Sequence, residues 1–259
     1  SYIMDIGEGM IKALIQEFCK DELDSFPIIN WHDSMRDYGC DKPDLRIPLK
    51  LIEISELVKD EEFKVFAEPA KDINSRVVAL KIPGGNSLSR SQIDDYTNFV
   101  SKLGAKGLAY IKVNDKSDIK NGLQSPILKF LKNETISSLI SDLDLENDDL
   151  LFFGAGKKSV VNLSMSSLIK KIGEDLSLYQ MKWAPCWVVN FPMFERNTDG
   201  DLTSLHHPFT LPDCCSSELK ASPEKSLAHA YDVVLNGYEI GGGSLRVFDT
   251  EMQKTIFEI

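Results

Sequence analysis

Apolar residues recur along the chain with two different periods, and each period predicts a type of element. The apolar positions 6, 10, 11, 14, 15 and 18 repeat at the spacing of a helix turn, which predicts an amphipathic helix over about 4–20 with this stripe facing the core. Runs rich in branched and aromatic residues are typical of strands and occur at 26–29, 64–66, 76–82, 107–113, 150–153 and 183–195. Further helices are expected at 31–38, 90–103, 135–143 and 158–176, with one more beginning at Pro126.

The residue pattern of the sequence changes near residue 62 and again near residue 182. Between these points strands and helices interleave without a strict repeat, which indicates an α+β module of its own. The segment 63–178 contains neither histidine nor cysteine. We expect it to bind or to act as a spacer, since side chains suited to nucleophilic or general-base chemistry are scarce there.

Two apolar runs meet at Asn236-Gly237, the strongest short signal for a β-hairpin with a two-residue turn. This turn sets the expected cross-strand pairs, which are Leu235 with Tyr238, Val234 with Glu239, Val233 with Ile240 and Asp232 with Gly241. Asp232 and Glu239 then share one face of the hairpin. Two adjacent carboxylates repel each other unless a cation lies between them, so Mg²⁺ together with a phosphate is a suitable ligand.

The glycine run 241–243 leaves that face without side chains, which is typical of a bulge or of a backbone that a ligand approaches closely. Arg246 would point away from Glu239 in a regular strand. A pocket shared by both therefore requires a one-residue bulge within 241–243. The alternative is an ordinary surface hairpin on which the carboxylates of Asp232 and Glu239 are solvated.

Two adjacent histidines, His206 and His207, precede Pro208. The residue before a proline is held in an extended conformation, in which neighbouring side chains point to opposite sides. At most one of the two is therefore expected to face a site. A buried structural histidine is the alternative interpretation.

The composition is that of an ordinary globular protein, with 259 residues, 42% hydrophobic and 27% charged. No apolar run is long enough to span a bilayer. The five cysteines lack a Cys-x-x-Cys spacing, so we expect reduced thiols in a cytoplasmic protein and no zinc site. A net charge of −11 argues against general polyanion binding, and any contact with nucleic acid must be local.

Several stretches, taken together and in order, resemble bacterial-type aspartyl-tRNA synthetases, which are class II enzymes. The matching stretches are 38–46 (YGCDKPDLR), 191–195 (FPMFE), 206–210 (HHPFT) and 236–246 (NGYEIGGGSLR). The segment 104–113 (GAKGLAYIKV) resembles the insertion module that these enzymes share with one of the subunits of the tRNA-dependent amidotransferases. By its residues alone, the charged loop 38–46 would be interpreted as a solvated connector.

The resemblance implies an α+β fold in which an insertion (GAD) domain at 63–178 separates two partial segments, 1–62 and 179–259, of a class II antiparallel catalytic sheet. It implies a ligase that activates L-aspartate with ATP and transfers the aspartyl group to the 3′ end of tRNA(Asp), and possibly of tRNA(Asn). The parent enzyme is expected to be a homodimer that binds neither membrane nor DNA.

The resemblance also assigns site residues. Arg246 corresponds to the residue that holds the side-chain carboxylate of aspartate, and a guanidinium fork suits two carboxylate oxygens. His206 corresponds to a histidine that closes over bound aspartate, with His207 as a second candidate. Glu239 corresponds to the ATP-site glutamate, and with Asp232 it would hold Mg²⁺. No catalytic acid or base is expected, because positioning and charge stabilisation carry this type of reaction.

Compared with the family, the sequence begins after the second class II motif and stops before the third, so we expect that it cannot activate aspartate alone. A noncatalytic tRNA-binding module related to the amidotransferase insertion domain is the alternative. A metal hydrolase using His206, His207, Asp232 and Glu239 is a third hypothesis, weakened because no His-x-x-x-His or comparable ligand spacing occurs.

Overall fold

The apolar runs of the sequence form the strands of two large sheets, one in each of two compact units. The computed structural model describes residues 2–197 and 200–259. The first unit comprises 1–34, 41–46 and 181–259, and the second comprises 35–40 and 47–180. The predicted insertion domain, 63–178, lies within the longer segment of the second unit, 47–180, and its bounds stay a prediction.

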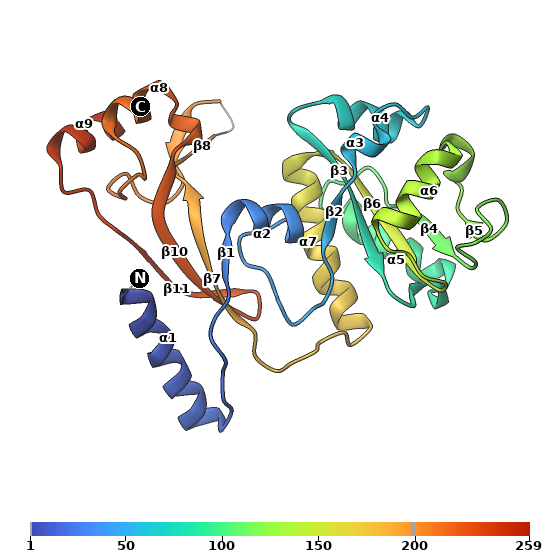
Figure 1. The fold of residues 1–259 in the computed structure, drawn as a ribbon, viewed down its shortest axis with the longest axis horizontal. Coiled ribbons are helices and arrows are strands. Elements are labelled where there is room, and N and C mark those ends of the chain that lie inside the picture. Colours follow the sequence, from blue (N-terminus) through green and yellow to red (C-terminus); the bar gives the residue numbers. More distant parts are fainter. Residues whose placement is uncertain (1, 198–199) are drawn as a thin grey trace. The chain divides into compact units, whose positions relative to one another are not determined.

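The first unit is built around a four-stranded sheet in the order β1-β7-β10-β11 (Figure 1). Strand β1 is parallel to β7, whereas β7, β10 and β11 are antiparallel, so this sheet is mixed and not purely antiparallel as expected. Its elements are α1 (Tyr2–Leu14), η1 (Ile15–Cys19), β1 (Ile28–Asn30), the start of α2 (Trp31–Tyr38), β7 (Pro185–Pro192), β8 (Phe194–Arg196), β9 (Leu202–Ser204), α8 (Ser216–Ala221), η4 (Pro223–Lys225), β10 (Leu227–Leu235), β11 (Tyr238–Ser244) and α9 (Thr250–Glu258).

Both faces of this sheet are covered. Successive side chains of β7 point to opposite sides of the sheet, and each set packs against other elements. Cys186 and Val188 pack in one cluster with side chains of α8 and α9, and Trp187 packs in another with α1. The stripe predicted to face the core from the first helix is only partly correct. Ile11 and Ile15 are buried in this second cluster, whereas the other four predicted positions, 6, 10, 14 and 18, are exposed.

The second unit is built around a five-stranded antiparallel sheet in the order β2-β3-β6-β4-β5 (Figure 1). Its elements are β2 (Leu51–Glu53), α3 (Ser55–Val58), α4 (Lys64–Lys71), β3 (Ser75–Ile82), η2 (Gly85–Ser87), α5 (Arg90–Ser101), β4 (Ala109–Val113), β5 (Leu123–Gln124), η3 (Leu128–Phe130), α6 (Asn133–Asp142), β6 (Leu150–Lys157) and α7 (Lys158–Asp175). Val78 and Leu80 pack towards α5 and α7, and Val77 and Ala79 pack towards α3, α4 and α6. The strand β3 is therefore buried on both faces.

Local signals predicted β3, β4, β6, α5, α6 and α7, whereas β2, α3 and β5 were not predicted and two predictions were wrong. Ser89 caps α5 in a reciprocal pair with Gln92, as its sequence position predicts. The run 64–66 is part of the helix α4 and not a strand; Phe63 and Phe66 are one helical turn apart and their rings meet edge-on at 4.8 Å. The helix expected from Pro126 is only the short 3-10 turn η3. Runs of three residues are too short for their period to distinguish strand from helix.

Candidate functional site

The β10–β11 hairpin closes at Asn236 and Gly237, which both have the positive φ that this tight turn requires. Leu235 pairs with Tyr238 and Val234 pairs with Glu239, as expected. The register then shifts by one residue.

The extra residue is Ile240, so the bulge precedes the glycine run instead of lying within 241–243. As a result Asp232 lies opposite Gly242 and not Gly241, and Val233 lies opposite Gly241. The predicted bulge is present, and its predicted position is wrong.

This register decides which side chains share a face. Asp232 lies on the same face as Val234, its next-but-one neighbour, and Val234 lies opposite Glu239. Alternation from Gly242 through Ser244 carries Arg246 to that face as well. Two carboxylates and one guanidinium therefore belong to a single side of the sheet.

Asp232 is the buried member of this group, with 7% of its surface exposed. Burial, followed by the charges of Glu239 and Asp41, raises the pKa of Asp232 to about 7, while Lys42 lowers it. The carboxyl group therefore changes charge near neutral pH. A buried carboxyl group surrounded by negative charge gains most from a nearby cation.

A lysine that sequence reasoning left without a role lies at this site. Lys42 Nζ is 3.0 Å from Oε2 of Glu239, and this hydrogen bond is the largest cause of a raised pKa of Lys42. The loop 41–46 that carries Lys42 is fixed internally, because Arg46 donates from Nε and Nη2 to the carboxylate of Asp44 at 2.9 and 2.6 Å. The signal available was the dense charge of 38–46, which a solvated connector explains equally well.

The two histidines diverge, as their position before a proline predicts. His206 meets the ring of Phe191 edge-on at 4.6 Å, and burial lowers its pKa. Its Nε2 is buried and has no hydrogen-bond partner among the described residues. His207 is exposed and stacks on Phe209 at 4.7 Å. His206 therefore has the unsatisfied polar atom that a bound ligand could pair.

Arg246 is exposed at the end of the hairpin. Its guanidinium carbon lies 4.5 Å from the centre of the Phe209 ring, which supports the charged group from one side. Within the described ranges no carboxylate lies at ion-pair distance from Arg246. The guanidinium group of Arg246 is thus available to bind the carboxylate of a ligand.

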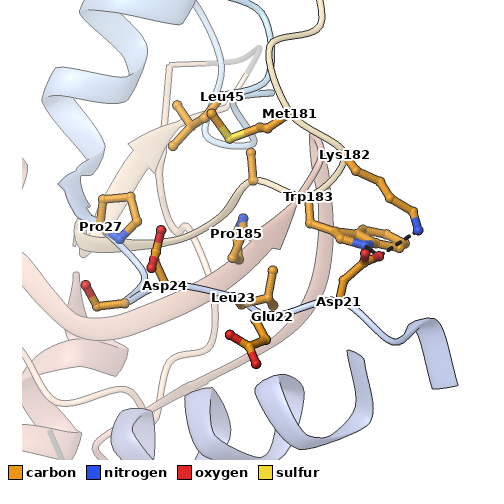
Figure 2. A pocket seen from close by; sticks show the side chains of 12 residues that line it. Asp21, Glu22, Leu23, Asp24, Pro27, Leu45, Met181, Lys182, Trp183 and Pro185 are labelled. Atoms are coloured by element: carbon orange, nitrogen blue, oxygen red, sulfur yellow. Dashed lines mark hydrogen bonds and ion pairs between the residues drawn. The ribbon is translucent and has the colours of Figure 1, made fainter. Parts of the chain in front are cut away.

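A separate hollow of about 540 Å³ lies elsewhere in the first unit. Figure 2 shows its lining, in which Asp21 accepts from the indole nitrogen of Trp183 at 2.8 Å and pairs with Lys182 at 2.6 Å. Neither Asp232, Glu239 nor any other predicted site residue lines this hollow. The candidate site is therefore a face of the sheet and not this cavity.

The donor set at the site limits the metal that it could hold. In the parts of the chain that the structure describes, no three histidine, cysteine, aspartate or glutamate side chains converge on one point. His206 and His207 point apart, so the arrangement expected of a metal hydrolase is not formed. Two carboxylates suit Mg²⁺, which usually keeps several waters or phosphate oxygens as ligands.

Across residues 2–197 and 200–259, no helix combines the length and the apolar character needed to cross a bilayer. All five cysteines are free thiols.

Residues 66–165 match the GAD domain family. This range lies within the second unit and contains the segment 104–113 that resembles the insertion module. A GAD domain is found in aspartyl-tRNA synthetases, in which it is an insertion domain. The chain therefore contains a GAD domain, and the prediction of this domain is confirmed.

Proposed function

We propose that the chain is the part of an aspartyl-tRNA synthetase that carries the GAD domain and the catalytic-domain segments on either side of it. The observation that carries the proposal is the face of β10 and β11. Its register brings Asp232, Glu239 and Arg246 to one side, next to Lys42, in a chain that contains a GAD domain. A GAD domain alone has no use for such a face.

Each side chain has a task that fits its surroundings. Arg246, supported by Phe209, takes the side-chain carboxylate of L-aspartate in a bidentate pair. His206 turns its unpaired Nε2 to the bound amino acid and closes the site. Lys42 neutralises Glu239 before substrates arrive and supplies a second positive charge for an anionic substrate.

ATP and Mg²⁺ complete the proposed site. Asp232 and Glu239 fit Mg²⁺ because they face the same way, and because burial, followed by the charges of Glu239 and Asp41, raises the pKa of Asp232 to about 7, so that a cation would stabilise its carboxylate. Bound there, Mg²⁺ would neutralise charge on the phosphates of ATP. Glu239 would contact ATP, while Arg246 and His206 orient aspartate so that its α-carboxylate faces the α-phosphate.

We propose that the parent enzyme is a cytoplasmic homodimer that transfers aspartate to tRNA(Asp), and possibly to tRNA(Asn).

Aspartate-dependent pyrophosphate exchange tests this proposal. We expect exchange by the full-length enzyme and loss of most of it in an Arg246→Lys variant of that enzyme. An unaffected Arg246→Lys enzyme would contradict the assignment of the site.

The alternative is a noncatalytic tRNA-binding module like the amidotransferase insertion domain. The match of residues 66–165 to the GAD domain family favours it as far as that range extends. The two hypotheses differ in the ligands of the first unit. Binding of L-aspartate that depends on Arg246 supports the synthetase, whereas tRNA binding without aspartate binding supports the module.

A further inference from the structure

The backbone on either side of residues 206–208, the histidine segment, is held by hydrogen bonds within the first unit. Before the segment, Leu205 donates its backbone N–H to the carbonyl of Met193 at 3.1 Å. After it, Val247 donates to the carbonyl of Phe209 at 3.0 Å. All of these residues belong to the first unit. The two ends of the histidine segment are therefore fixed by the backbone itself.

Gln253 of α9 makes the connection between these two points. Its Nε2 donates to the carbonyl of Pro208 at 2.7 Å, and this carbonyl is the backbone hydrogen-bonding group of a residue that has no N–H. Within residues 2–197 and 200–259, the backbone of the histidine segment makes no other hydrogen bond outside its own turn, in which Thr210 donates to the carbonyl of His207 at 3.0 Å. The middle of the segment thus depends on one side-chain donor.

The helix that carries Gln253 is itself firmly placed. Met252 and Ile256 are buried in the core cluster of the first unit, and the side chain of Asp249 caps the start of α9. Gln253 lies in the first turn and is half-buried. Its amide group is therefore presented from a rigid support, which makes it suitable for fixing a loop.

The histidine segment and the residue after it carry two parts of the proposed site. His206 has the buried Nε2 without a partner, and the ring of Phe209 lies 4.5 Å from the guanidinium carbon of Arg246. The carbonyl of Pro208 lies between these two residues in the chain. A shift of this carbonyl would therefore displace the imidazole and the aromatic support together.

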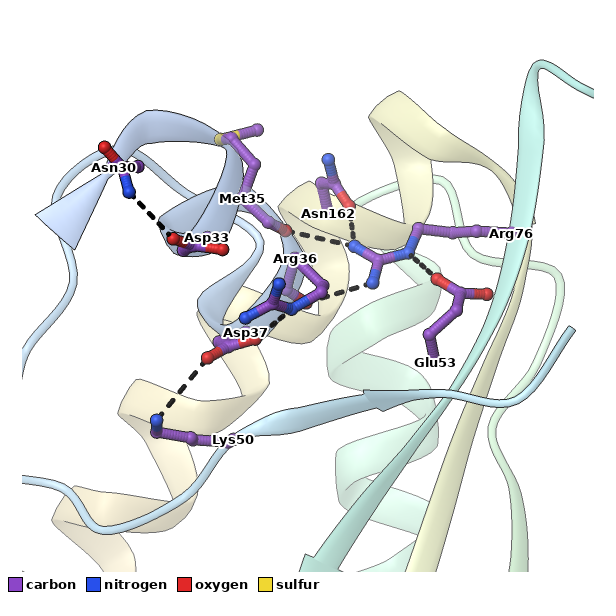
Figure 3. Close-up of polar contacts among 9 residues, drawn as sticks. All are labelled: Asn30, Asp33, Met35, Arg36, Asp37, Lys50, Glu53, Arg76 and Asn162. Carbon is purple, nitrogen blue, oxygen red and sulfur yellow. Dashed lines mark hydrogen bonds and ion pairs between the residues drawn. The ribbon is translucent and has the colours of Figure 1, made fainter. Parts of the chain in front are cut away.

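The second unit holds an end of helix more redundantly. There Arg76 donates to the carbonyls of Met35 and Arg36 at 3.1 and 3.0 Å (Figure 3). In addition, Gly39 packs on Asn162, whose carbonyl oxygen would lie 2.8 Å from a Cβ on that glycine. For the histidine segment, the described part of the chain provides Gln253 alone. Loss of this single donor should be enough to release the segment.

We propose that Gln253 is a positioning residue, which through the carbonyl of Pro208 holds His206 towards the bound amino acid and Phe209 against Arg246. The inference rests on the proposed function for the identity of the ligand, and on the geometry of the first unit for the positioning itself. A loop that is fixed before the ligand arrives loses less conformational entropy when the ligand binds.

The first test measures the reactivity of His206 in the whole chain with diethyl pyrocarbonate, followed by tandem mass spectrometry, at about pH 7, where imidazole is largely neutral. His229, which is exposed in the same unit, is the internal reference. Gln253→Met keeps the length of the side chain and removes the N–H donor. We expect this variant to raise the ratio of His206 to His229 modification about three- to tenfold, the range for loss of one hydrogen bond.

Gln253→Glu is the second variant, because it keeps the shape of the side chain while an ionised carboxylate cannot donate. It should raise the ratio as Gln253→Met does, whereas a residue that acts by packing alone would tolerate this change. Gln16→Met is the matched control, since it makes the same substitution at an exposed glutamine of the first unit. The control should leave the ratio unchanged.

The second test is titration with L-aspartate followed by NMR. Gln253→Met should weaken binding about three- to tenfold, and Gln16→Met should bind as wild type does. Urea unfolding shows that the variants are folded.

An unchanged His206 ratio in Gln253→Met, or a rise in Gln253→Met without a rise in Gln253→Glu, would overturn the inference. So would unchanged L-aspartate affinity in a Gln253→Met protein. The proposed function is judged separately. If the wild-type protein does not bind L-aspartate, that proposal fails, while the His206 ratio still decides whether Gln253 positions the histidine.

Discussion

Asp232 and Gly242 lie directly opposite each other across β10 and β11, so close that a Cβ on the glycine would overlap Oδ1 of the aspartate. Because Gly242 has no side chain, the carboxyl group of Asp232 has room on this face of the hairpin. A glycine is needed here for space and not for an unusual backbone conformation.

Gly242→Ala should therefore destabilise the first unit by about 1–3 kcal/mol, because the new methyl group forces Asp232 from its position. Gly241→Ala is the matched control, since its Cβ would lie at an ordinary 3.5 Å from Cγ1 of Val233. We expect that control to change stability by less than about 1 kcal/mol. Urea unfolding of both variants measures the difference, and equal effects would contradict the steric account.

The raised pKa of Asp232 should make stability fall with increasing pH. The folded protein keeps the proton up to about pH 7, whereas the unfolded chain releases it near the ordinary value of 3.8. Between these values the folded state binds more protons, so the free energy of unfolding decreases as pH rises. Asp232→Asn should be more stable than wild type by about 2–4 kcal/mol at about pH 8 and similar to it near pH 4.

Urea unfolding at several pH values checks this prediction. Asp24→Asn, which removes an exposed carboxylate of the same unit, is the control and should follow the wild-type curve. If the difference between Asp232→Asn and wild type does not change with pH, Asp232 has an ordinary pKa.

Mg²⁺ binding should strengthen with pH through the same range, because the cation requires the deprotonated carboxylate of Asp232. We expect binding at about pH 8 to be roughly tenfold tighter than at about pH 6 and to release a proton at the lower pH. Calorimetry in two buffers with different ionisation enthalpies counts the protons. Asp232→Asn should remove both the pH dependence and most of the affinity, and an unchanged affinity in that variant would place the cation elsewhere.

Arg246→Lys should weaken L-aspartate binding by about tenfold or more, since an ammonium group cannot hold two carboxylate oxygens in one plane. Titration followed by NMR compares L-aspartate with L-asparagine, which lacks the second carboxylate. Wild type should prefer aspartate, and the variant should lose this preference. Arg196→Lys is the control, because Arg196 already pairs with Glu224. Equal loss of both ligands in Arg246→Lys would indicate damage to the fold.

The sequence was most informative where structure depends on neighbours along the chain. The turn at Asn236 and the cap at Ser89 are local, and both were predicted correctly. The position of the bulge was not predicted correctly, because it depends on how β11 pairs with β10, which no local pattern encodes.

Lys42 was missed for the same reason. Its ion pair joins positions 42 and 239, which lie far apart in the sequence, and the charged loop around Lys42 resembles any solvated connector. The exposed part of the apolar stripe on the first helix was misjudged because helical period identifies an apolar face but not which element covers it.

The close packing of Gly39 on Asn162 and of Ile47 on Gly173 bears on protein engineering. A shortened protein made by excising 47–180 and splicing the cut ends would keep every predicted ligand-binding side chain, yet Gly39 would lose Asn162, the residue against which it packs. Such a trimmed protein would need a redesigned brace at that splice.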